Sequence, residues 1–351
     1  MHHKTKLTWK EADRLISIST KEITSDRICA EPLVSVCLIT YNHRKFIHDS
    51  VDSVLAQITQ FPFEVVISDD CSSDGTTDIV LDYQRVNPDK IRVLLAKETL
   101  GKHTGNGRLN FIRTLRTCRG KYIALLEGDD YWTAPQKLQK QVEFLESHPE
   151  YAGAFHDTSV LEADGAAGDP KRWWQDFGDR LDATHEDTIS INTPFHTSSF
   201  VLRRENIANL PAVFLQFGSG DLPIYILSAA RGPLRRISMS MSVWRNHDGG
   251  ISKTSAHRAV GGALQKRFMM CALRKHLYPI GKDRFNEAIE EYNHQLFSLW
   301  NQSRSVERLA LLQAAWANCE RRLAREIVLS SIHRKATRTL AALRRRIFRR
   351  A

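Results

Sequence analysis

A regular alternation of buried strands and amphipathic helices between residues 33 and 150 restricts the fold more than any other feature. Apolar, β-branched runs at 33–40, 63–70, 91–96 and 121–127 are each followed by apolar side chains at helical spacing. Strands that are apolar throughout are typical of parallel sheets covered by helices on both faces. The sequence therefore predicts an α/β fold with a mostly parallel sheet and right-handed crossovers.

The pattern changes on both sides of this region. Residues 1–31 are polar and weakly periodic, which predicts an extension or a short helix. Beyond residue 150 we expect strands at 151–160 and 197–204, a loop rich in Gly, Asp and Trp at 163–190, and a helix at 221–230. The predicted units are an N-terminal extension (1–31), a main domain with two halves (32–150 and 151–255) and a helical C-terminal region (256–351).

Composition favours a folded cytoplasmic protein. No apolar run approaches the roughly 18 residues that a membrane span requires, and the first residues lack the apolar core of a signal peptide. The six cysteines form no CxxC pair and no zinc-ligand pattern with histidine. We therefore expect reduced thiols in or near the core, without disulfides or a structural zinc.

The positive charge is concentrated at the C-terminus. The formal net charge is +10, and residues 331–351 carry eight Lys or Arg and no acid. In a helix, Leu340, Leu343 and Ile347 would share one face among arginines, which indicates peripheral contact with an anionic membrane. A solvated tail is the alternative. The chain lacks the aromatic and basic interleaving of RNA-binding sheets and a helix-turn-helix signal, so no nucleic-acid partner is expected.

Polar and acidic residues follow three of the four predicted strands. The first strand ends in Thr40, Tyr41 and Asn42, and the second ends in Asp69 and Asp70. In LLEGDDYW, the fourth strand ends in Glu127, Asp129 and Asp130. Ligands of open parallel sheets bind at the carboxyl ends of the strands, so these residues mark the predicted site.

Carboxylates this close together repel unless a cation offsets their charge. Mg²⁺ or Mn²⁺ would do so, with a substrate diphosphate completing the oxygen ligands, and would stabilise charge on a departing diphosphate as a Lewis acid. The alternative is that Asp70 and the 127–130 acids are solvated residues of turns and helix caps.

Two nucleotide-binding motifs are excluded. The segment after the first strand, TYNHRKF, contains no glycine, so the GxGxxG of a dinucleotide-binding fold is absent. The segment GKHTGNG at 101–107 lacks the spacing and the closing Lys and Ser or Thr of a P-loop. We interpret it as a flexible turn.

Several motifs in order resemble the inverting family 2 glycosyltransferases of the GT-A fold. These are VSVCLITYNHRKFI, EVVISDDCSSDGTTDI and GKYIALLEGDDYW, followed by TSSFVLRR, FGSGDLPIYIL and MSVWRNHDGGIS. The resemblance extends from about residue 33 to 150 and resumes as far as about residue 252. It implies a GT-A fold with a helical C-terminal extension.

The resemblance also implies roles for residues at the strand ends. Asp70 would bind the nucleotide base, Asp129 the ribose and Asp130 the metal. The segment Thr40 to Asn42, with Tyr41, would frame the nucleotide pocket. Glu127 stands where many family members have Asp, so its part in metal binding is open.

Three further residues receive roles from the resemblance. Asp221, in GSGDLPIY, would be the general base at the start of a helix, with Pro223 in its first turn. Arg245 and His247 would bind the donor diphosphate from a mobile loop, and the alternative is a surface turn. We expect His196 to be a hydrogen-bonded strand histidine, and the alternative is that it points into the acceptor cleft.

The function implied is metal-dependent, inverting transfer of a sugar from a nucleotide-diphosphate sugar, with UDP favoured, to an acceptor hydroxyl. The acceptor would be a surface polysaccharide, lipopolysaccharide or lipid-linked glycan. A nucleotidyltransferase is one rival, although the glycine-rich loop expected after its first strand is absent. The other rival is a catalytically silent sugar-nucleotide-binding or scaffold protein.

Overall fold

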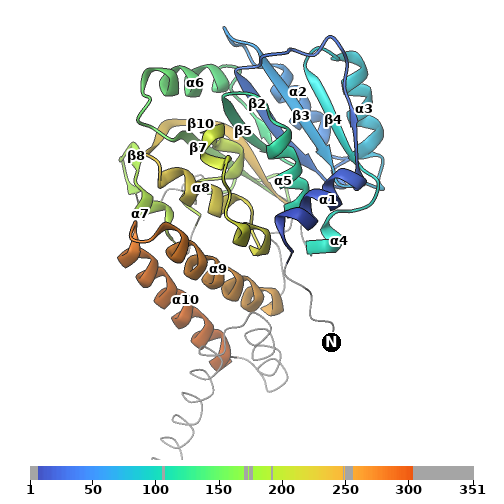
Figure 1. Ribbon diagram of the computed structural model, residues 1–351. Helices are drawn as coiled ribbons and strands as arrows, with labels where there is room; N and C mark the ends of the chain where they lie inside the picture. The colour runs from blue at the N-terminus through green and yellow to red at the C-terminus, as the bar shows by residue number, and fades with distance from the viewer. Residues whose placement is uncertain are drawn as a thin grey trace, which may run out of the picture.

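The computed structural model describes residues 7–302, except 105–106, 170–172, 174–176, 191–192, 248 and 250–255. A single mixed sheet runs through its centre, with helices on both faces (Figure 1). The strands are β1 (Thr20–Ile23), β2 (Val34–Thr40), β3 (Phe63–Asp69), β4 (Ile91–Ala96), β5 (Tyr122–Glu127), β6 (Tyr131–Trp132), β7 (Gly153–Glu162), β8 (Asp182–Ala183), β9 (Val201–Arg203) and β10 (Leu234–Asn246). The predicted basic tail lies outside the described residues.

The helices follow the expected alternation in the first half of the chain. They are α1 (Trp9–Ser19), α2 (Ile47–Leu55), α3 (Thr76–Val86), α4 (Gly101–Thr104), α5 (Arg108–Thr117), α6 (Lys137–Ser147), α7 (His185–Thr188), α8 (Asp221–Ala229), α9 (Ala256–Leu277) and α10 (Lys282–Gln302). Short 3₁₀ helices are η3 (Thr197–Ser199), η4 (Arg204–Ile207) and η5 (Ala212–Gln216). None of the described helices is long and apolar enough to span a membrane.

The strand order is β1-β4-β3-β2-β5-β9-β7-β10-β6, with β8 paired to β10. Strands β2, β3, β4 and β5 are mutually parallel, as the βα units predict. Antiparallel β9 separates β5 from β7, and β10 then runs parallel to β7. The β7–β10 ladder shifts register between Ile237 and Ser242, where β10 bulges.

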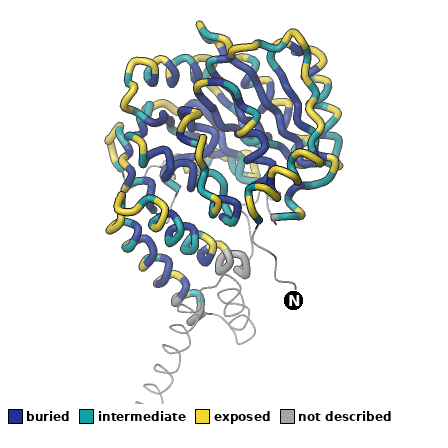
Figure 2. Tube along the Cα trace, viewed as in Figure 1, coloured by how far each residue is buried: buried dark blue, intermediate teal, exposed yellow. Residues whose placement is uncertain are grey.

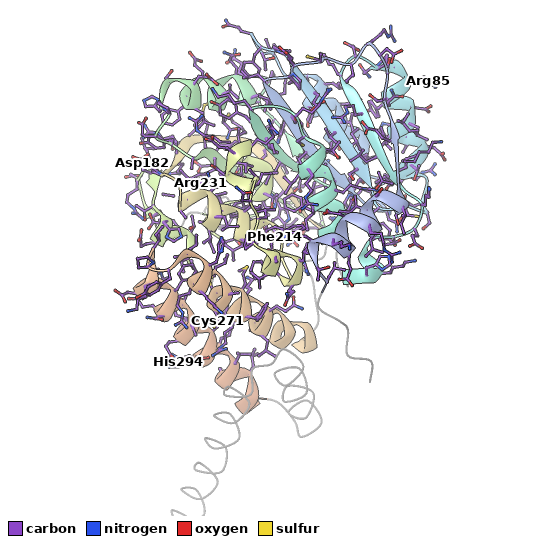
Figure 3. All side chains as sticks on the ribbon, in the orientation of Figure 1. Arg85, Asp182, Phe214, Arg231, Cys271 and His294 are labelled. Carbon is purple, nitrogen blue, oxygen red and sulfur yellow. The ribbon has the colours of Figure 1, made fainter. Side chains whose placement is uncertain are left out.

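Two apolar layers hold the sheet. On one face, α2, α3 and α6 pack against alternate side chains of the central strands, such as Val36 and Val65. On the other, α5 packs against the intervening ones, such as Cys37 and Val66, and the same apolar core continues into α1, α8, α9 and α10. Burial is therefore concentrated along the strands, and exposed positions lie on the outer helix faces (Figure 2). Phe214 of η5 lies in this second core, whereas Arg85 of α3 lies on the surface (Figure 3).

Several local predictions were wrong in extent. The helix expected over 46–59 ends at Leu55, and Ile58 is exposed because the chain has already turned away from the sheet. The strand expected over 197–204 is limited to β9, because η3 occupies its first residues. The predicted loop at 163–190 contains β8 and α7. The N-terminal extension adds α1 and places β1 antiparallel to β4 at the sheet edge.

Candidate active site

Three strand ends meet at one edge of the sheet. Because β2 lies between β3 and β5, the register sets Thr40 opposite Asp69 and Ile39 opposite Glu127. The ladder continues past the strands, since the Asp70 amide donates to the Thr40 carbonyl at 3.1 Å and the Gly128 amide donates to the Ile39 carbonyl at 2.8 Å. The structure thus brings these strand ends to a common rim.

The centre of the rim is a cluster of Glu127, Asp130 and His196. Each offers one ligand atom, and these atoms lie within 4.8 Å of one another. Nε2 of His196 is 3.7 Å from Oδ2 of Asp130. That Oδ2 is buried and has no hydrogen-bond partner among the described residues, whereas Oδ1 accepts from the Arg245 amide at 2.9 Å. Two carboxylates and an imidazole, with a buried carboxylate oxygen that has no partner among the described residues, could hold a divalent cation.

Burial and mutual repulsion perturb these acids in the absence of a cation. Burial, with the charges of Asp129 and Asp221, raises the pKa of Glu127 to about 8. Burial, with the charges of Asp129 and Glu127, also raises the pKa of Asp130 well above its usual value. Carboxyl groups held in this state are typical of sites that bind a cation or transfer a proton.

Asp129 is held by two histidines. Its Oδ2 accepts from His247 Nε2 at 3.1 Å and lies 3.7 Å from His43 Nε2. Although burial acts to raise the pKa of Asp129, the His247 hydrogen bond and the His43 charge lower it. Its Oδ1 and the hydroxyl of Thr40 are buried without partners among the described residues. Both atoms are therefore free to bind a ligand.

Asp70 caps the short helix α4. Its Oδ1 accepts from the Leu100 amide at 2.7 Å and its Oδ2 from the Gly101 amide at 3.3 Å. Burial raises the pKa of Asp70, although these two hydrogen bonds act against it. The segment predicted as a flexible turn is thus helical at 101–104 and is tied to the rim by Asp70.

Asp221 is the first residue of α8. Gly220 precedes the helix as its N-cap, and Pro223 lies in the first turn, as predicted. The Asp221 carboxylate accepts hydrogen bonds from the hydroxyls of Ser219 and, at 3.4 Å, Thr197. Its charge contributes to the raised pKa of Glu127, so the two carboxylates lie close enough to interact.

A family model described as Glycosyl transferase family 2 matches residues 35–209. This region includes every strand of the rim and the Glu127–Asp130 segment. The chain belongs to glycosyltransferase family 2.

Two curated proteins are similar in sequence to this family 2 chain. An uncharacterized protein of Mycobacterium tuberculosis is 35% identical over 222 residues, which are 62% of this chain and 60% of that protein. The Bacillus subtilis protein named putative teichuronic acid biosynthesis glycosyltransferase TuaG is 37% identical over 135 residues, 38% of this chain and 50% of TuaG. The match to the mycobacterial relative therefore spans about 60% of its length.

Solved structures bear on the fold of this family 2 chain. TarS 1–349 of S. aureus, crystallised in complex with UDP-GlcNAc, superposes with a TM-score of 0.58 at 18% identity, covering 80% of this chain and 79% of TarS 1–349. The mostly parallel sheet flanked by helices is that of the GT-A glycosyltransferases, as the sequence predicted.

Arg245 of this family 2 chain has contacts that a mobile loop would not provide. It lies in β10, and its guanidinium contacts the Asp49 carboxylate, the Asp129 carbonyl at 2.9 Å and the Tyr131 ring at 4.4 Å. His247 follows the strand and packs on the Phe46 ring at 4.6 Å. The rest of the predicted loop, 250–255, lies outside the described residues.

The predicted nucleotide-pocket residues of the first strand differ in their contacts. Tyr41 is exposed and available to a ligand. The backbone of Asn42 is in the left-handed region, with φ of 56°. Its side-chain Oδ1 accepts a hydrogen bond from the Ser73 amide at 2.8 Å. Cys71, on the adjacent loop, is also left-handed, with φ of 65°. Such strain in non-glycine residues is concentrated at functional sites, and here it lies in the two loops that follow β2 and β3.

His196, expected as a strand histidine, is instead the N-cap of η3. Its partners Glu127 and Asp130 are far away in the sequence, so no local spacing indicated this cluster.

Two buried cations behind the rim also lacked a sequence signal. Arg113 of α5 donates to the carbonyls of Asp69 at 3.0 Å and Leu94 at 3.3 Å and to the Ser68 hydroxyl at 3.0 Å. Lys137 is fully buried with its Nζ 4.1 Å from the centroid of the Trp132 ring. Both hold rim segments from behind, since their side chains connect helices to the ends of strands.

Proposed function

We propose that this chain transfers a sugar from a nucleotide-diphosphate sugar to an acceptor hydroxyl, with inversion at the anomeric carbon and dependence on Mg²⁺ or Mn²⁺. One observation carries the proposal. The Glu127, Asp130 and His196 ligand atoms cluster within 4.8 Å on the GT-A rim, and Asp221 opens a helix beside them.

The donor would occupy the rim between α4 and β6. Its base and ribose would contact Tyr41, Asp70 and Asp129, where the free Asp129 Oδ1 and Thr40 hydroxyl offer hydrogen-bond acceptors and a donor. Glu127, Asp130 and His196 would hold the metal. When bound, a divalent cation supplies neutralisation of the charge that develops on the leaving diphosphate.

Asp221 would act as the general base. Its carboxylate takes the proton of the acceptor hydroxyl as that oxygen forms a bond to the anomeric carbon. The bond from this carbon to the diphosphate oxygen breaks on the opposite face, and the nucleoside diphosphate leaves with the electron pair. The Ser219 and Thr197 hydroxyls orient the carboxylate toward the acceptor side. General-base assistance of this kind contributes roughly 10²- to 10⁴-fold to the rate.

The relatives support the proposed donor and acceptor. UDP-GlcNAc in the TarS structure supports a UDP-sugar donor, and the name of TuaG supports an acceptor in a surface polysaccharide. Lipopolysaccharide and lipid-linked glycans share the same acceptor chemistry. We place the protein in the cytoplasm, with the basic C-terminal tail in peripheral contact with the inner face of an anionic membrane.

The test is a product assay with a panel of nucleotide sugars in Mn²⁺ and in EDTA. We expect nucleoside diphosphate as the product in Mn²⁺ only, and loss of that product in Asp130→Ala. The matched control is Asp89→Ala, an exposed acid before β4 at the opposite edge of the sheet. Pyrophosphate as the product would show a nucleotidyltransferase, and no metal-dependent turnover of any donor would refute the proposal.

A further inference from the structure

A second concave site lies at the opposite edge of the sheet from the acidic rim. It is a groove of about 980 Å³ between the end of α5, the start of β5, η4 and the first turn of α1. The six residues of β5 separate it from Glu127, a distance of roughly 20 Å along the strand. Five cations and one acid line what we call the cationic groove: Arg116, Arg119, Lys121, Arg203, Arg204 and Glu205.

Two of the cations are fixed in place. Arg203 is buried and donates to the carbonyls of Tyr151 and Leu145, each at 2.7 Å, and to the Tyr122 hydroxyl at 3.1 Å. These partners are neutral, so they orient the guanidinium without cancelling its charge. Arg119 is anchored by the buried carboxylate of Glu64 at 2.6 Å.

The remaining three cations can turn toward a ligand. Arg116 and Lys121 pair with Asp13 and Glu146, which do not line the groove, and all four side chains are 42–54% exposed. Exposed ion pairs contribute little and exchange readily for a better partner. Arg204 is exposed and uses only Nε, which donates to the Gly120 carbonyl at 3.0 Å. Its other N–H groups have no partner among the described residues.

The floor of the cationic groove is apolar. Trp9, Leu115, Ile207 and Leu210 line it beside the cations. The Arg116 guanidinium stacks on the Trp9 ring at 4.2 Å, so cationic and apolar surfaces are continuous. A ligand that fills the groove therefore needs a compact anionic group next to an apolar body. The paired N–H groups of a guanidinium can donate to two oxygens of one phosphate, so arginines bind a phosphate better than an anion with a single acceptor atom.

We propose that the cationic groove binds an amphiphilic phosphate, in which a phosphate ester carries an apolar chain. The site is separate from the donor rim and does not depend on the proposed glycosyl transfer. A phosphate would accept charge-assisted hydrogen bonds from the unused N–H groups of Arg204 and could replace the exposed acids that now pair with Arg116 and Lys121. The apolar chain then covers Ile207 and Leu210, which the fold leaves partly exposed.

The experiment measures binding to the full chain by calorimetry with three soluble probes. These are dihexanoyl-phosphatidylglycerol, dihexanoyl-phosphatidylcholine and inorganic phosphate, each below any micelle concentration. We expect the phosphatidylglycerol to bind at least tenfold more tightly than either other probe. Equal binding by inorganic phosphate would contradict the apolar part of the proposal, and equal binding by the phosphatidylcholine would contradict the anionic part.

Two variants locate the site. Arg204→Gln, on the surface of η4, should weaken phosphatidylglycerol binding about tenfold, since it removes hydrogen bonds to a charged group. Arg85→Gln changes an exposed arginine of α3 that does not line the groove, and it should leave phosphatidylglycerol binding unchanged. Hydrogen exchange should show ligand protection at 204–210. Equal losses in both variants, or protection elsewhere only, would place the ligand on another basic surface and overturn the proposal.

Discussion

Replacing Glu127 by Gln should stabilise the metal-free protein by about 3 kcal/mol at pH 7. Glu127 and Asp130 offer oxygen atoms within 4.8 Å of each other. At that distance two ionised carboxylates would repel by about 3.5 kcal/mol at an effective dielectric near 20, so ionisation of both in the metal-free native state is disfavoured. The pKa of Glu127 gives a free energy of similar size. Burial and the charges of Asp129 and Asp221 raise it to about 8, which costs about 3 kcal/mol of stability at pH 7.

The pH dependence has a defined sign. With a pKa of about 8 against an ordinary value of 4.5, the native state keeps a proton at Glu127 that the unfolded state has already released. Because the native state binds more protons, the stability of the metal-free protein falls as pH rises from about 4.5 to about 8. Glu127→Gln removes this dependence.

The assay is urea unfolding in EDTA at several pH values between 5 and 8, with Glu143→Gln as the control because Glu143 is exposed on α6. A second series in Mn²⁺ and UDP should stabilise the wild type more than Glu127→Gln, since a ligand that binds only the native state stabilises it. If Glu127→Gln were less stable than the wild type in EDTA, or kept the same slope with pH, the account of the acidic cluster would be refuted.

Three other substitutions test separate parts of the structure. Asp221→Asn should lower turnover by roughly 10²- to 10⁴-fold and leave the donor Kd nearly unchanged, as measured by steady-state kinetics and calorimetry; full activity would remove Asp221 from the mechanism. Lys137→Met should raise the free energy of unfolding at pH 7 by about 1–2 kcal/mol, as measured by urea unfolding. Burial holds the pKa of Lys137 well below its usual value, so protonation favours the unfolded state. A loss of stability would show that the contacts of Lys137 with Trp132 and Gln141 outweigh the cost of its burial. Arg113→Met should destabilise by about 2–4 kcal/mol, since the carbonyls of Asp69 and Leu94 lose a buried donor; a change below about 0.5 kcal/mol would contradict this.

The first half of the fold could be predicted because its information is local. Each βα unit carries its own apolar run and its own helix spacing, and parallel strands then bring their carboxyl ends to the same edge. Thr40, Asp70, Asp130 and Asp221 could be singled out for this reason, since each stands at the boundary of an element.

The features that the sequence did not predict depend on contacts between residues far apart in the chain, which no local pattern encodes. Three of the four residues of β1 are polar, and its strand conformation comes from pairing with the edge of β4. His196 joins Asp130 only because η3 is held beside the end of β5 in the folded chain. Arg113 and Lys137 are long charged side chains at helix positions where the sequence predicts solvent, and burial of such groups depends on tertiary contacts.

The bulge in β10 lies between two ends of the strand that contact different parts of the molecule. Its first residues hold the loop side through Arg236 and Asp157, whereas its last residues fix Asp130 through the Arg245 amide. The extra β10 residues between Ile237 and Ser242 shift the register with β7, so the two ends of β10 need not keep one continuous register. We therefore expect sequence changes in the loops beside Arg236 to be absorbed in mid-strand, so that the acidic rim stays constant while those loops diverge.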